Sequence, residues 1–96
     1  MKKFKLTPAA VNDLKEIALY TQNKWGINKR NLYLTSLNDK FIWLSENPDI
    51  GRNRNDIKEN YLSYPEGKHI IFYRTKKPNI EILGILHQSM DVKNHL

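Results

Sequence analysis

The first part of the chain changes from a strand-like to a helix-like pattern of apolar residues. Residues 3–7 alternate polar and apolar side chains, which is the period of a half-buried strand. Thr7 and Pro8 then indicate a helix start, because a threonine hydroxyl can cap free backbone amides and proline suits the first helical position. Over residues 8–24 one apolar stripe recurs at three- and four-residue spacing, which predicts an amphipathic helix. The stripe consists of Ala10, Leu14, Ile17, Ala18, Thr21 and Trp25.

A second helix is predicted directly after the first. Gly26 is expected to end the first helix and Asn28 to open the next. The second stripe stops at Asn47, since Pro48 disfavours a helical conformation at the residue before it. Two helices with so short a connection are expected to form an antiparallel hairpin. The apolar positions of the second helix are Tyr33, Leu37, Phe41 and Leu44.

The second half of the chain predicts a sheet. Residues 49–60 are polar and aperiodic, as in a loop, and residues 88–96 form a polar tail. Strands are expected at 61–64, 69–76 and 80–87, separated by turns at 65–68 and 77–79. The fold class is therefore α+β: an N-terminal strand and an antiparallel two-helix hairpin packed on a mainly antiparallel sheet that ends in a three-strand meander. Without a repeat or linker, we expect residues 1–96 to form a single domain.

Composition narrows the class of partner. Sixteen Lys and Arg against ten Asp and Glu give a net charge of +6, which favours an acidic partner. The absence of cysteine excludes disulfides and thiolate zinc sites and fits a reducing compartment. No stretch resembles a signal peptide or the roughly 20 apolar residues of a membrane span. We therefore expect a cytoplasmic protein that makes no use of a membrane.

Little in the sequence suggests cofactor chemistry. The three histidines, His69, His87 and His95, have no helical partner four residues away, so no metal site is expected. The four glycines form no phosphate loop, and no cofactor is expected.

One group of residues could perform chemistry on RNA. If Arg74 and His87 approach each other in the meander, arginine could steady a charged phosphorane while His87 or Tyr73 moves a proton. The alternative is structural: Tyr73 in the core, Arg74 at a solvated strand end and His87 capped or buried. Spacing alone favours this alternative. The group consists of Arg52, Arg54, Lys68, Tyr73, Arg74 and His87.

Several short motifs occur in a particular order along the chain. They include Thr7, Asp13-Leu14, Asn47-Pro48-x-x-Gly51, Gly51-Arg52-x-Arg54-x-Asp56-Ile57, Gly67-x-His69-x-Ile71-Phe72-Tyr73-Arg74 and Ile85-Leu86-His87-x-x-Met90-Asp91. In this combination the sequence resembles, over essentially its whole length, the ParE toxins of bacterial toxin–antitoxin modules within the RelE/ParE superfamily.

The resemblance implies the predicted fold and a biological role. It implies a toxin that inhibits DNA gyrase and blocks replication, neutralised by a ParD-like antitoxin whose C-terminal segment wraps it in a hetero-oligomer. Such a toxin has no catalytic activity of its own and no sequence-specific DNA binding alone. The alternative within the superfamily is a RelE-type ribonuclease that cuts mRNA on the ribosome. A third possibility is an inactive relative kept only as a partner of its antitoxin.

Particular positions favour the gyrase branch. The Arg52–Ile57 and Ile85–Asp91 motifs are of the ParE kind, and Ser63 and Ile71 are expected on an exposed sheet face where a ribonuclease would carry charge. Gly84 departs from many ParE relatives, which have arginine there. A glycine at this place indicates a bulge or a close backbone approach.

The resemblance and the residue types together suggest two binding sets. The expected target-binding residues are Arg52, Arg54, Arg74, His87, Met90, Asp91 and His95, with Arg52, Arg54, Arg74 and His87 as the catalytic set in the ribonuclease alternative. The expected antitoxin-binding residues are Trp43, Tyr33, Leu62 and Tyr64. For the loop arginines the structural alternative is that Asp56 pairs with one of them. The tail is expected to be flexible.

Overall fold

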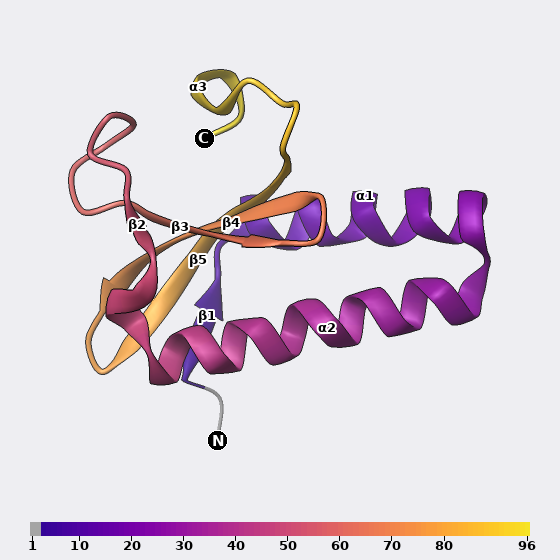
Figure 1. Cartoon of the computed structure of the whole chain (residues 1–96), viewed down its shortest axis with the longest axis horizontal. Helices are drawn as coiled ribbons and strands as arrows, with labels where there is room; N and C mark the ends of the chain where they lie inside the picture. The colour runs from indigo at the N-terminus through magenta and orange to yellow at the C-terminus, as the bar shows by residue number, and fades with distance from the viewer. Residues whose placement is uncertain (1–2) are drawn as a thin grey trace.

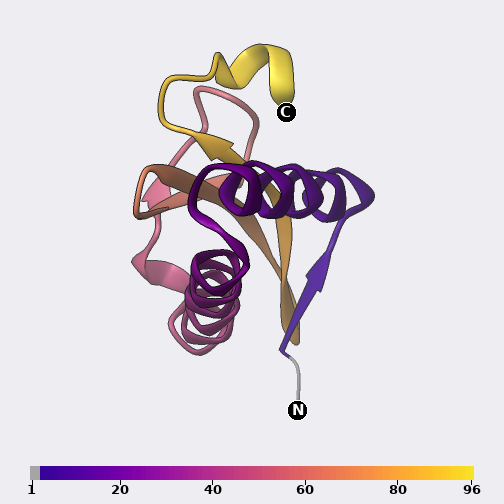
Figure 2. The same cartoon turned by 90° about the vertical axis from the view of Figure 1, so that its right-hand side faces the viewer.

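The chain folds as a helical hairpin against a five-stranded sheet (Figures 1 and 2). The computed structural model describes residues 3–96. Its elements are β1 (Phe4–Leu6), α1 (Pro8–Trp25), α2 (Ile27–Glu46), the 3-10 turn η1 (Pro48–Ile50), β2 (Arg52–Asn53), β3 (Leu62–Glu66), β4 (His69–Lys76), β5 (Asn79–His87) and α3 (Val92–His95). The predicted α+β class is confirmed. Within residues 3–96, no helix combines the length and apolarity needed to cross a bilayer.

The two long helices begin and end at the expected signals. The Ala10 N–H donates to the Thr7 side-chain oxygen at 3.1 Å, and Gly26 caps α1 with a φ of +94°. Trp25, expected in the buried stripe, is 62% exposed. The tip of the hairpin extends past the sheet (Figure 1), so the last turn of α1 has no strand beneath it to bury the indole.

The sheet has the strand order β1-β5-β4-β3-β2. Strand β1 pairs in parallel with β5, and the other neighbours are antiparallel. The predicted 49–60 loop contains η1 and β2, which the sequence pattern did not indicate. Pro65, expected in a turn, belongs to β3. It lies where β2 no longer pairs with β3, a place that a residue without an N–H tolerates.

Apolar side chains fill both faces of the sheet. The larger cluster lies between the sheet and the hairpin and includes Leu37, Phe41, Leu44, Ile71 and Tyr73. A second cluster on the opposite face consists of Phe72, Leu83 and Leu86, with Ile57, Tyr61, Ile70, Val92 and Leu96 packed against it. The second face is therefore covered in part by the 54–61 loop and by α3.

This second cluster corrects two expectations. Ser63 and Ile71 are not exposed: they are 5% and 0% accessible, on opposite faces of the sheet, because both faces carry a core. The polar tail is not a free end either. Residues 92–95 are helical, and Val92 and Leu96 anchor them on the second cluster.

Tyr73 fixes the corner where α2 gives way to the sheet. Its buried hydroxyl donates to the Pro48 carbonyl at 2.9 Å and accepts from the Gly51 N–H at 2.9 Å. A Cβ at position 51 would overlap this hydroxyl, so the contact requires glycine. Tyr73 is thus a core residue, as the structural alternative held, and its ring positions the start of β2.

We predict that Tyr73→Phe lowers the free energy of unfolding by about 1–3 kcal/mol, because two backbone groups of the corner lose their buried partner. Urea unfolding followed by circular dichroism measures this. The matched control is Tyr20→Phe, whose ring is 61% exposed and whose loss of a hydroxyl should change stability by no more than about 0.5 kcal/mol. Equal stability of the two variants would contradict the role of Tyr73.

Candidate functional site

The two loop arginines have different surroundings. Arg54 donates two hydrogen bonds of 3.1 Å to the Asp56 carboxylate, and its guanidinium lies 5.4 Å from the centre of the Phe72 ring. The bond from Arg54 is the main cause that lowers the pKa of Asp56 below 3.8. Arg54 therefore holds the loop on the second cluster, as the structural alternative proposed. Arg52 on β2 is exposed and forms no ion pair within the described chain.

Arg74 and His87 do not approach each other, so of the two readings of the sequence the structural alternative holds for this pair. Arg74 pairs in register with Glu81, and its Nε donates to that carboxylate at 2.8 Å. His87 pairs with His69 at the other end of the sheet. Because β4 and β5 are antiparallel, the ends of consecutive strands lie at opposite ends of the sheet. Within the set of the ribonuclease alternative, His87 is thus separated from Arg74 by the length of the strand pair.

His87 belongs instead to a small aromatic group beneath the hairpin. Its ring meets that of His69 edge-on at 5.6 Å, and the Tyr33 hydroxyl lies 2.6 Å from His69 Nδ1. Burial, with a smaller contribution from Glu66, raises the pKa of Tyr33 to about 12, so its phenol remains a donor. Together with Tyr20, Thr21, Trp25, Lys29, Gly67 and Lys68, these rings line a cavity of about 280 Å³.

His69 is a member of this group that the sequence pattern did not indicate. A regular hairpin counted from the Lys77-Pro78 turn would have placed Leu86 opposite His69. The register shifts by one residue at Phe72 and Gly84, and this shift brings His87 there instead. The signal was Gly84, where a bulge had been expected: a glycine within a strand marks such a shift.

Of the expected tail residues, Met90 and Asp91 come directly before α3, and His95 is its last residue. Asp91 caps the helix by accepting from the Lys93 N–H at 3.1 Å and from the Asn94 side chain at 2.9 Å. Met90 is 41% exposed and His95 is exposed, so both are available to a partner. Asp91 has a structural task, whereas Met90 and His95 do not.

The four expected antitoxin-binding residues lie along the line where α2 meets β3, here called the α2–β3 seam. The Trp43 and Tyr64 rings are 5.2 Å apart, and the Lys40 ammonium lies over both, at 4.6 and 5.2 Å. Leu62 packs beside them, and Tyr33 reaches the Glu66 carbonyl at 3.2 Å. A cleft of about 420 Å³ lies on this seam, lined by Ser36, Asp39, Lys40, Trp43 and Glu66.

Among residues 3–96 no three or more His, Cys, Asp or Glu side chains gather where they could hold a metal ion. Beyond Ser63 the outer edge of β3 has no strand partner in the described chain, and there Pro65 offers no N–H to an added strand. The seam thus presents the partly exposed Trp43 and Tyr64 rings beside a strand edge that is poorly suited to pairing with another strand.

We predict that His69 makes stability depend on pH. Burial, and then the neighbouring His87, lower its pKa in the folded state below 6.5. Between the pKa of folded His69 and pH 6.5, the unfolded chain thus binds more protons than the folded chain. The contribution of His69 to the free energy of unfolding is therefore fully present above pH 6.5 and is lost as the pH falls towards the folded pKa. His69→Gln should remove this decrease in urea unfolding between about pH 7.5 and 5, and the exposed His95→Gln should retain it. An unchanged slope in His69→Gln would refute the assignment.

Comparisons with known proteins identify the family of the chain. Residues 4–92 match the family described as "ParE toxin of type II toxin-antitoxin system, parDE". A Toxin ParE1 of Caulobacter vibrioides is 31% identical over 96 residues, covering 100% of this chain and 99% of that protein. A Toxin ParE1 of Mycobacterium tuberculosis is 36% identical over 95 residues, covering 98% and 97%. A structure titled "Chromosomal ParDE TA system from P. aeruginosa" matches the fold with a TM-score of 0.75 and 20% identity, over 91% of this chain and 96% of that one. The chain therefore belongs to the ParE toxins of type II toxin–antitoxin systems.

Proposed function

We propose that this chain inhibits DNA gyrase, thereby blocking replication, and that a ParD-like antitoxin neutralises it by binding the α2–β3 seam. The observation that carries the proposal is the match to ParE toxins over residues 4–92. The toxin and its target then act in the cytoplasm. When the toxin is silenced, it forms a hetero-oligomer with the antitoxin.

The structure supports a binding role over the ribonuclease alternative. A phosphodiester-cleaving site needs its acid, base and charge-stabilising groups around one phosphate. Here Arg54 is engaged with Asp56, Arg74 with Glu81, and His87 lies at the far end of β5. Arg52, Met90 and His95 remain as exposed contacts for a large partner. Arginine and a flexible apolar side chain such as methionine are common in protein interfaces.

The antitoxin side of the proposal depends on the seam. Trp43 and Tyr64 present large, partly exposed rings that are already held in place by each other and by Lys40. Rings fixed in this way lose little conformational freedom when they are covered, which favours their use as anchors. The Lys40 ammonium beside Glu66, at 3.7 Å, adds a polar rim.

The first experiment is plasmid supercoiling by purified DNA gyrase with added toxin, with and without the antitoxin. Inhibition that the antitoxin reverses is expected. Arg52→Ala should raise the toxin concentration for half-inhibition about tenfold, because an exposed guanidinium without an internal partner is available to the target. Lys58→Ala, an exposed cation on the same loop, is the matched control. No inhibition by folded toxin would overturn the gyrase proposal and direct attention to mRNA cleavage on ribosomes.

For the antitoxin we predict that Trp43→Ala raises the dissociation constant about tenfold or more, since it removes an aromatic anchor. Isothermal titration calorimetry with the purified antitoxin measures this. Trp25→Ala, which removes the other tryptophan from the hairpin tip, should change the constant little. An unchanged dissociation constant for Trp43→Ala, in protein whose circular dichroism matches the parent, would exclude the seam.

A further inference from the structure

The end of the sheet farthest from the histidines carries an excess of positive charge. Three adjoining strands place Lys5, Glu81 and Arg74 in one row, because Lys5 and Arg74 both pair in register with Glu81. The cations here, named the lysine end, are Lys3, Lys5, Arg74, Lys76 and Lys77.

Three of these side chains, Lys5, Arg74 and Lys76, lie on the face of the sheet opposite the helical hairpin, whereas Lys77 is in the turn between β4 and β5. Phe4 and Leu6 pack into the cluster under the hairpin, so Lys5 between them projects from the opposite face. On β4 the same alternation places Arg74 and Lys76 on the face of Phe72. Lys5, Arg74 and Lys76 are therefore on the opposite face of the sheet from the α2–β3 seam.

One carboxylate organises the group without neutralising it. The Glu81 side chain is only 16% exposed and lies 2.8 Å from the Arg74 Nε and 3.8 Å from the Lys76 Nζ. Two of the five cations thus pair with this carboxylate, in a chain with a net charge of +6. The Lys76 side chain remains 62% exposed.

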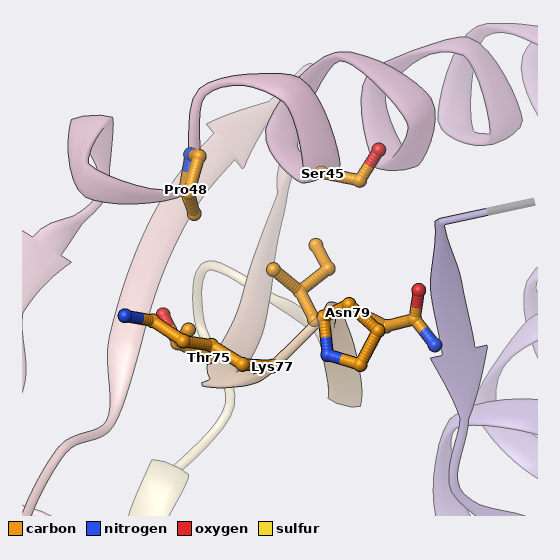
Figure 3. Close-up of a pocket in the computed structure, with 7 residues that line it drawn as sticks. Ser45, Pro48, Thr75, Lys77 and Asn79 are labelled. Carbon is orange, nitrogen blue, oxygen red and sulfur yellow. The ribbon is translucent and has the colours of Figure 1, made fainter.

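The lysines converge on a small cleft. Lys5, Lys76 and Lys77 line a volume of about 110 Å³ together with Asn79 and Glu81. This is well below the roughly 300–1,000 Å³ of small-molecule sites, and suits one anionic group of a larger ligand. Lys77 also borders a second cleft, together with Ser45, Pro48 and Thr75. Its side chain extends along Thr75 and away from the Asn79 amide (Figure 3).

The surroundings indicate which polyanion fits. The exposed large apolar side chains of the described residues all lie outside positions 3–6 and 74–81. A protein interface would require an apolar centre, and a membrane surface would require apolar side chains to insert. A site made of exposed lysines and polar turn residues matches the backbone phosphates of nucleic acid, whose recognition is mainly electrostatic.

We propose that the lysine end binds the phosphate backbone of duplex DNA without regard to sequence. Duplex DNA carries about one negative charge per 1.7 Å of its axis, so it presents a row of phosphates to the cations of β1, of β4 and of the turn after β4. Lysine binds phosphate as a compact point charge. This contact is independent of the gyrase and antitoxin proposals.

The test is fluorescence anisotropy of a labelled duplex of arbitrary sequence, titrated with the full chain between about 50 and 200 mM salt. The double variant Lys76→Gln/Lys77→Gln should bind at least about tenfold more weakly than the parent, and its slope of log affinity against log salt should be shallower by about two. Lys15→Gln/Lys29→Gln has the same net charge and changes exposed lysines of the hairpin, so it should retain most of the affinity and the slope.

Equal weakening of the two double variants would overturn the proposal, since net charge alone would then explain binding. Polyglutamate distinguishes the class of polyanion. If it displaces the duplex as well as unlabelled DNA does at equal charge, the surface is not specific for nucleic acid and the proposal fails. Supercoiling inhibition by the variants is recorded separately, so loss of DNA binding and failure of the gyrase proposal are distinguishable.

Discussion

The arrangement of the molecule depends on how α1 satisfies the exposed edge of β5. Strand β1 covers this edge only from Ile80 to Ile82. Beyond it, the Thr7 hydroxyl donates to the Leu83 carbonyl at 3.1 Å, and the Asp13 carboxylate accepts from the Ile85 N–H at 3.0 Å. Two side chains of the helix start thus replace a missing strand. Burial raises the pKa of Asp13, and the Ile85 N–H opposes that rise by favouring the carboxylate. These bonds fix the direction in which the hairpin crosses the sheet.

Gly84 allows this approach and also divides the sheet surface. A Cβ there would lie 2.8 Å from the end of the Leu96 side chain and 3.2 Å from the Asp13 carboxylate, so a side chain would displace the first and crowd the second. The same residue carries the register shift that sets His87 opposite His69. The arginines and histidines are consequently distributed over opposite ends and faces of the sheet. The Arg74 and His87 side chains are thus held at opposite ends of the β4–β5 pair.

Local signals in the sequence were sufficient for most of the fold, because Thr7, Gly26 and Pro48 act on their own neighbours. Where sequence reasoning failed, the outcome depended on partners distant in the chain. Trp25 has a helical spacing that indicates burial, but no strand extends beneath it. Ser63 is polar, as residues at exposed positions usually are, yet the 54–61 loop and α3 cover that face of the sheet. The proximity of Arg74 and His87 could have been rejected from strand direction alone.

The separation of surfaces has a consequence for how silencing can work. The α2–β3 seam faces the hairpin side, and Lys5, Arg74 and Lys76 of the lysine end lie on the other face of the sheet. An antitoxin that covers only Trp43 and Tyr64 would therefore leave the charge of Lys5 and Lys76 exposed. If both surfaces act as proposed, the silenced complex still attracts DNA, and neutralisation operates by blocking the contact with gyrase while the toxin's electrostatic field remains. Long-range attraction of this kind weakens with salt, whereas the side-chain contacts at the seam depend on it much less.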